Sequence, residues 1–250
     1  MGTDLHISAV AGIPDVASCD DLGALIAAAV RRGGRAVETG DVFVVAQKVV
    51  SKAEGAIVRL DEVEPSALAS RWAAANGKDP RSVEVILRES RRIVRMDRGL
   101  LIVETHHGFV CANAGVDASN VPAGFVTVLP RDPDASAERL RRGLSAAFDR
   151  SIAVIVSDTF GRPWREGVVN VALGVAGLRP MIDYRGGTDT YGRPLQATVV
   201  ALADELAAAA EVVTRKAAGL PVAIVRGAGE WVGEGSGRLL LRDAAHDLFR

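Results

Sequence analysis

The sequence predicts an α+β protein with a mixed β-sheet. Apolar runs typical of strands and periodic segments typical of helices both occur along its 250 residues, but they do not alternate regularly. The strand-like runs at 100–104 and 109–112 are separated by a gap too short for a crossover to a parallel strand, so they predict an antiparallel hairpin. A plain doubly wound parallel sheet is therefore disfavoured.

Each expected element follows from its local pattern. The basic stretch Arg88–Arg98 interleaves arginines with apolar residues and is interpreted as a partly buried helix. Strands are expected where β-branched and aromatic residues form short apolar runs, at 42–50, 56–60, 100–104, 109–112, 125–129, 152–157 and 222–226. Helices are expected where apolar residues recur at helical spacing, at 21–32, 66–75, 82–94, 135–148, 168–176 and 200–217.

Length and composition limit the domain organisation and the partners. We treat residues 1–250 as one domain, with a possible junction between two subdomains at 130–134, where prolines flank charged residues. A net charge of −1 argues against a nucleic-acid-binding protein, which is usually clearly basic. The two cysteines, Cys19 and Cys111, do not suggest a disulfide framework, and we expect Cys111 to be a buried thiol.

The sequence also gives no sign of secretion or membrane insertion. The N-terminus lacks a basic region followed by an apolar stretch, as a signal peptide would have. The longest apolar segment, 22–30, is far shorter than a membrane-spanning helix requires. We therefore expect a cytoplasmic protein with no membrane partner.

The most informative segment is the apolar run that ends in Asp158 and Thr159. Ligands commonly bind at the carboxyl ends of buried strands in proteins that contain helices and sheets. Asp117 lies in a similar setting, just past another apolar run. Carboxylate and hydroxyl oxygens are ligands that Mg2+ and Mn2+ prefer, and Arg162 and Arg165 could hold a phosphate nearby. Together these residues suggest a site for metal and phosphate built from distant segments.

A second unusual segment is 47–55, which we expect to continue a buried strand. Strand alternation would then place Lys48, Val50 and Lys52 on one face and Ser51 on the other. A lysine presented by a buried strand could bind phosphate, although a solvated strand end is the simpler interpretation.

The usual nucleotide-binding loops are absent from the sequence. No GxxxxGK[ST] phosphate-binding loop occurs, and the GxGxxxG at 227–233 is one residue too long for a dinucleotide fingerprint. Any nucleotide must therefore be bound in another way.

Simpler roles remain open for each of these residues. A single Asp after a strand is more often a helix cap or a turn residue than a metal ligand. At the level of the whole protein, the same aspartates would also suit a metal-dependent phosphatase, and the lysines and arginines without paired metal ligands would suit a nucleotide-binding module without catalytic activity.

The chain resembles the coenzyme F420:L-glutamate ligase family over essentially its whole length. Several long matches carry the resemblance: GIPD at 12–15, VVAQKVVSKAEG at 44–55, ANAGVDASNV at 112–121, SDTFGRPWREG at 157–167, ADELAAAAE at 203–211 and PVAIVRG at 221–227. The resemblance implies a GTP- and metal-dependent ligase that adds L-glutamate to a deazaflavin cofactor precursor. With a deazaflavin as ligand, the non-catalytic alternative is a deazaflavin- or nucleotide-binding module. It also implies a fold of two interwoven subdomains and a homodimer.

The resemblance further implies roles for individual residues. At position 216 it implies a neutral amide, and Lys216 departs from this pattern. Two divalent ions, Mg2+ or Mn2+, are implied as cofactors, with K+ as a further candidate. The implied roles are nucleotide binding for Ile13, Pro14, Asp15, Val16, Gln47, Lys52 and Asn120, metal binding for Asp117, Asp158 and Thr159, and electrostatic catalysis for Lys52, Arg162 and Arg165.

The reaction implied by the resemblance explains why such a site would be needed. A free carboxylate does not condense with an amine in water, because its leaving group is too poor. Transfer of the γ-phosphate of GTP to the carboxylate of the precursor would give an acyl phosphate. The amine of glutamate would then displace phosphate, leaving GDP and phosphate as the other products.

Overall fold

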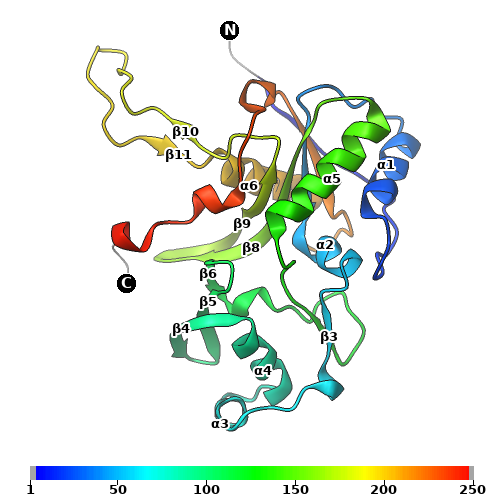
Figure 1. The fold of residues 1–250 in the computed structure, drawn as a ribbon, viewed down its shortest axis with the longest axis vertical. Coiled ribbons are helices and arrows are strands. Elements are labelled where there is room, and N and C mark those ends of the chain that lie inside the picture. Colours follow the sequence, from blue (N-terminus) through cyan, green and yellow to red (C-terminus); the bar gives the residue numbers. More distant parts are fainter. Residues whose placement is uncertain (1–3, 248–250) are drawn as a thin grey trace.

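The computed structural model describes residues 4–247 and has a central five-stranded sheet with helices on both faces (Figure 1). The strand order is β1-β12-β2-β8-β9. β2 and β8 are parallel, whereas every other neighbouring pair in this sheet is antiparallel. The expected α+β fold with a mixed sheet is therefore confirmed. The strands are β1 (His6–Ala9), β2 (Val42–Ala46), β8 (Ala153–Arg162), β9 (Arg165–Ala176) and β12 (Val222–Arg226).

Three long helices enclose this sheet. α1 (Leu22–Arg32) and α5 (Pro133–Phe148) pack on one face, and α6 (Leu202–Thr214) packs on the other. Successive residues of β2 alternate between the two cores, so that Phe43 joins the first and Val44 the second. A strand that is buried on both faces has an uninterrupted apolar sequence, which explains why the strands at 42–50, 152–157 and 222–226 could be predicted from apolar runs.

A smaller lobe, drawn below the central sheet in Figure 1, contains a three-stranded sheet and two helices. The pairing of β5 with β6 is antiparallel, which confirms the predicted hairpin. Leu101 and Val103 of β5 pack against α3 and α4 in a separate core. A two-stranded sheet, β3-β7, also belongs to this part of the chain. The elements are β3 (Ile57–Arg59), α3 (Ala67–Asn76), α4 (Pro80–Arg88), β4 (Ser90–Asp97), β5 (Leu100–Thr105), β6 (Val110–Ala112) and β7 (Phe125–Thr127).

Two further features complete the fold. The short strands β10 (Ile182–Asp183) and β11 (Val199–Val200) pair as an arm, drawn in yellow, that extends away from the central sheet (Figure 1). Cys111 is buried, as expected. Within residues 4–247, no helix is both long and apolar enough to cross a bilayer.

The helix expected at 168–176 is wrong, because this segment lies in β9. The valines of the segment favour an extended backbone, and β9 pairs with β8 along most of its length. Gly174 then allows close packing, since a Cβ at this position would lie 2.1 Å from the carbonyl oxygen of Pro133. The N-terminus of α5 therefore rests directly on the backbone of β9.

The helix expected at 88–98 is also wrong. α4 ends at Arg88, and the basic segment continues as β4, which pairs with β5 through two irregularities in register. Ile93 packs on the core of the smaller lobe, while Arg92 lies 2.9 Å from the buried carboxylate of Glu104. Burial and pairing with β5 therefore make residues 90–97 a strand, and the helical spacing of their apolar residues is coincidental.

The strand expected at 42–50 ends early, at Ala46, and α2 (Gln47–Ala53) follows without a loop. Gln, Lys and Ala are good helix formers, so local propensity favours a helix from Gln47 onward, where β2 ends. Lys48 and Lys52 still share one side, because residues four apart lie on the same face of a helix. The prediction that Lys48 and Lys52 face the same way therefore holds, but through helix geometry and not through strand alternation.

Candidate active site

The candidate site begins where the parallel pairing of β2 with β8 ends. Ala46 of β2 and Ser157 of β8 are register partners, and each is the last residue before a polar side chain. Gln47 follows the first and Asp158 the second. β2 ends at Ala46, whereas β8 continues to Arg162 beside β9, so a ligand can reach Gln47 and Asp158 at the edge where β2 stops.

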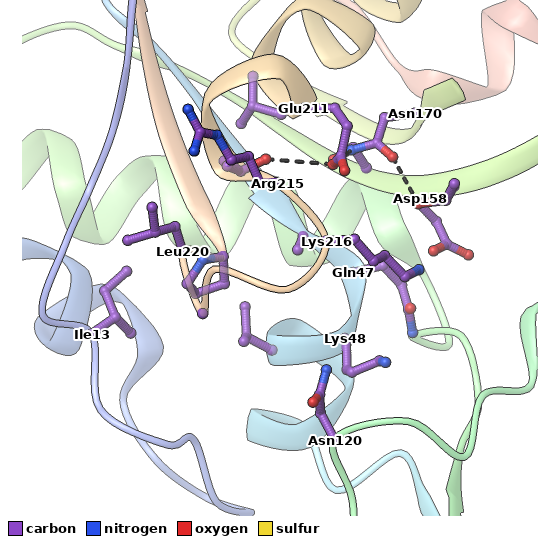
Figure 2. Close-up of a pocket in the computed structure, with 18 of the residues that line it drawn as sticks. Ile13, Gln47, Lys48, Asn120, Asp158, Asn170, Glu211, Arg215, Lys216 and Leu220 are labelled. Carbon is purple, nitrogen blue, oxygen red and sulfur yellow. Dashed lines mark hydrogen bonds between the residues drawn. The ribbon is translucent and has the colours of Figure 1, made fainter. Parts of the chain in front are cut away.

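A cavity of about 490 Å³ opens at this edge (Figure 2). It gathers residues from the N-terminal loop, α2, the smaller lobe, β8, β9 and the end of α6. The residues predicted for nucleotide and metal all line it: Ile13, Pro14, Asp15, Val16, Gln47, Lys52, Asp117, Asn120, Asp158 and Thr159.

Asp117 reaches the cavity through a strained turn. Asn113, Ala114 and Gly115 all have positive φ, at 53°, 54° and 70°. Left-handed backbone at two consecutive non-glycine residues costs free energy and persists only where the surroundings hold it. Asp117 is then fixed by two backbone hydrogen bonds with Thr127, of 3.1 and 2.8 Å. The turn therefore aims the carboxylate out of the smaller lobe toward α2.

The Asp117 carboxylate is well satisfied by neighbouring donors. The ammonium of Lys48 lies 2.7 Å from Oδ2, and the backbone N–H of Ser119 donates to Oδ1 at 2.7 Å. Burial alone would raise the pKa of this carboxyl, but the hydrogen bonds from Lys48 and Ser119 hold the pKa below its usual value. Asp117 is thus ionised and ready to bind a cation.

Asp158 has the opposite electrostatic environment. Burial raises its pKa to about 6, and the negative charge of Asp117 adds to the increase. The backbone N–H of Thr159 and the charges of Lys216 and Lys48 act in the other direction without cancelling it. A carboxylate disfavoured in this way gains more from a bound cation than an exposed one would.

Asn170 and Glu211 are site residues that the sequence alone did not reveal. The hydroxyl of Thr159 donates to Oδ1 of Asn170 at 2.8 Å, and Nδ2 of Asn170 donates to Glu211 at 3.0 Å (Figure 2). Asn170 is the register partner of Thr159 across the β8–β9 hairpin. It could not be found from sequence while this segment was interpreted as a helix.

Lys52 links α2 to the N-terminal loop. Its ammonium is buried and donates to Oδ1 of Asp15 at 2.8 Å, which lowers the pKa of that carboxyl. Gln47 is buried as well and donates to the carbonyl oxygen of Val128 at 3.2 Å. The amide of Gln47 therefore also fastens α2 to the segment that follows β7.

Arg162 and Arg165 are not brought to the cavity within one chain. They lie at the turn between β8 and β9, and neither lines the cavity. The guanidinium of Arg162 donates to the carbonyl oxygen of Glu166 at 2.6 Å, closing the turn. Between them, Trp164 has a φ of 57° and is 81% exposed.

The oxygen atoms that line the cavity suit a hard divalent cation whose coordination shell is completed by a bound ligand. Asp117 and Asp158 offer carboxylate oxygens, and Thr159 offers a hydroxyl. In the part of the chain that the structure describes, no group of three or more His, Cys, Asp or Glu side chains gathers to hold an ion. Mg2+ and Mn2+ commonly use one or two carboxylates and complete their shell with water and phosphate oxygens, which is what this cavity allows.

The fold and cavity define an α+β protein with a polar site that suits a phosphate-bearing ligand and lacks a phosphate-binding loop. The model of the F420-0:gamma-glutamyl ligase family matches residues 12–227, and the chain belongs to this family. The chain is 50% identical to the coenzyme F420:L-glutamate ligase of Methanothermobacter thermautotrophicus over 98% of its own length and 99% of the relative. It is 50% identical to that of Methanopyrus kandleri over 92% of both chains, and 45% identical to that of Methanocaldococcus jannaschii over 86% of both.

Proposed function

We propose that the protein is a cytoplasmic ligase that joins L-glutamate to a deazaflavin coenzyme F420 precursor, using GTP and a divalent metal. The family match supports the ligase activity. The observation that carries the nucleotide and metal part is the convergence of Asp117, Asp158 and Lys52 on one cavity from three different segments. A ligase that activates a carboxylate needs negative and positive groups together, to hold a metal and to neutralise phosphate charge.

In the proposed complex one end of the cavity binds the nucleotide and the other end holds the metal and the reacting groups. Ile13, Pro14 and Val16 offer apolar surface and backbone groups to the base of the nucleotide, and Asn120 offers an amide. Lys52, held in place by Asp15, presents a positive charge to the phosphates.

The reacting end of the cavity is the one that contains the carboxylates. Mg2+ or Mn2+ held here would supply positive charge against the negative charge that develops on the phosphate during transfer. Asp117 and Asp158 would hold this ion, with the neighbouring hydroxyl of Thr159 as a further ligand. Asn170 fixes the Thr159 hydroxyl by accepting its hydrogen bond, so this oxygen keeps its lone pairs for the cavity.

One assay separates the ligase from the alternatives. GDP and phosphate release is measured with GTP and Mn2+, with and without both the deazaflavin precursor and L-glutamate. Release that requires both co-substrates supports the ligase. Release without them would instead indicate a metal-dependent phosphatase, and no release under any condition would indicate a binding module.

Two further measurements use the same assay. Repeating it with ATP tests the preference for guanine nucleotides, and equal turnover of ATP and GTP would contradict that preference. Adding K+ to the metal-activated reaction tests whether it is a further cofactor.

We also propose that two copies of the chain pair through the β8–β9 hairpin and the β10–β11 arm. Large apolar side chains are exposed on both: Trp164 and Val168 on the hairpin are 81% and 63% exposed, and Tyr191 on the arm is 86% exposed. Such exposure on projecting elements is typical of protein–protein contacts. Pairing is also the arrangement through which Arg162 and Arg165 could contact substrate, since they lie outside the cavity of their own chain.

A further inference from the structure

The positive charges in the cavity are not equally available to a ligand. Lys48 is paired with Asp117 at 2.7 Å, and Lys52 is paired with Asp15 at 2.8 Å. Lys216 also lines the cavity, and no ion pair is recorded for it within residues 4–247. Its ammonium therefore has its charge free for a ligand that enters the cavity.

Lys216 is presented to the carboxylate end of the cavity by the way α6 terminates. The helix ends at Thr214, and Arg215 has a φ of 53°, which turns the chain out of the helical path. Lys216 follows at once and lies around the same cavity as Asp158 and Glu211 (Figure 2). Its charge is close enough to Asp158 to lower the pKa of that carboxyl.

The chemistry of lysine differs from that of the amide implied at this position by the resemblance. An amide oxygen can coordinate a metal ion, whereas an ammonium has three N–H donors and no lone pair. A divalent ion placed beside Asp158 and Thr159 would also be repelled by the fixed charge of Lys216. A phosphate group would be attracted by the same charge.

From this juxtaposition of an unpaired ammonium and the Asp158 carboxylate, we propose that Lys216 takes the place of a second divalent ion. Its ammonium binds the phosphate of the nucleotide directly, and each chain holds a single divalent ion between Asp117 and Asp158. This inference rests on the proposed function, because it concerns the metal and nucleotide of that same site. It differs from the expectation of two ions that the resemblance carries.

The test counts bound Mn2+ by electron paramagnetic resonance of the free ion, in the presence of a saturating non-hydrolysable GTP analogue. The wild-type protein is expected to bind one Mn2+ per chain. Lys216→Gln restores an oxygen ligand and removes the charge, and is expected to bind two. Lys216→Met removes the charge without supplying an oxygen. It is expected to bind one ion and to bind the GTP analogue about tenfold more weakly, the cost of one charge-assisted hydrogen bond.

Lys78→Gln provides the matched control, because Lys78 is an exposed lysine that does not line the cavity. This variant should keep one Mn2+ and unchanged affinity for the analogue. Two ions in the wild type would overturn the inference and leave the proposed function standing. One ion in both the wild type and Lys216→Gln would also overturn it, as would unchanged affinity for the analogue in Lys216→Met. A wild-type protein that binds neither Mn2+ nor the analogue would overturn the proposed function and the inference with it.

Discussion

The ammonium of Lys48 lies 2.7 Å from Oδ2 of Asp117, so one of the two carboxylates of the site is already neutralised by the protein. None of the ion pairs within residues 4–247 involves Asp158, and burial raises its pKa to about 6. The two carboxylates therefore contribute differently: Asp117 is preformed as an anion, whereas Asp158 gains most when a cation arrives. This asymmetry leads to the first two predictions.

Asp117→Asn and Asp158→Asn should each lower the ligase rate by on the order of 100-fold or more, because each removes a charged ligand while barely changing shape. If the two residues hold one ion, the double variant should be little slower than either single variant. The measurement is the ligase rate against Mn2+ concentration for all four proteins. Losses that simply multiply in the double variant, or a nearly normal single variant, would show that the carboxylates act separately.

Asp158→Asn should stabilise the metal-free protein at pH 8. The folded-state pKa of about 6 lies above the usual 3.8, so the folded protein binds this proton more tightly than the unfolded chain does. Stability from this group is therefore lost as pH rises through that range, at a cost on the order of 1–3 kcal/mol. Melting curves in EDTA should show the variant a few degrees more stable at pH 8, with the gap closing near pH 4. A variant that melts lower than wild type at pH 8 would contradict this account.

Gly115→Ala should destabilise the turn that presents Asp117. The position has a φ of 70°, and a Cβ there would lie 2.6 Å from Cδ2 of Leu129. Strain and crowding together should reduce the free energy of unfolding by about 2–3 kcal/mol. Gly77→Ala is the control, since Gly77 has a similar φ of 64° but no atom within 4 Å of the added Cβ. Equal losses in urea denaturation would mean that the contact with Leu129 contributes nothing.

Asn170→Ala should weaken Mn2+ binding through Thr159. Without the carbonyl oxygen of Asn170, the Thr159 hydroxyl loses its 2.8 Å hydrogen bond and the fixed direction of its lone pairs. Loss of such an outer partner typically costs 10- to 100-fold in metal affinity. The dissociation constant for Mn2+ is measured by calorimetry, with Asn76→Ala, which does not line the cavity, as the control. Unchanged affinity in Asn170→Ala would assign this network to folding alone.

The protein should be a homodimer at micromolar concentration, because exposed side chains on the β8–β9 hairpin and the β10–β11 arm offer apolar surface for a partner. Light scattering gives the mass directly, and Trp164→Ser together with Val168→Ser should shift the protein toward monomer. Both residues are already exposed in the single chain, so the double change should leave the fold of the monomer intact. A monomeric wild type would rule out this architecture.

The sequence by itself determined the parts of the fold whose signals are local. Uninterrupted apolar runs marked the buried strands, and the short gap after Thr105 predicted the hairpin between β5 and β6. The position of Asp158 at the end of such a run was enough to nominate it as a site residue. Its partner Asp117 was nominated in the same way, whereas the nucleotide-binding residues that line the cavity were named only through the resemblance to a known family.

The tertiary structure decided whatever depended on pairing between distant segments. Residues 168–176 became a strand because β8 lies beside them, and only that register places Asn170 opposite Thr159. Residues 47–53 became a helix where β2 meets the carboxyl edge of the sheet. Arg162 and Arg165 lie close to Asp158 in sequence, yet the long hairpin carries them away from the cavity. The periodicity of apolar residues indicates which face of a segment is buried. It does not indicate which strands pair, because pairing depends on the whole fold. The charged neighbours of each carboxylate could therefore be assigned only from the tertiary structure.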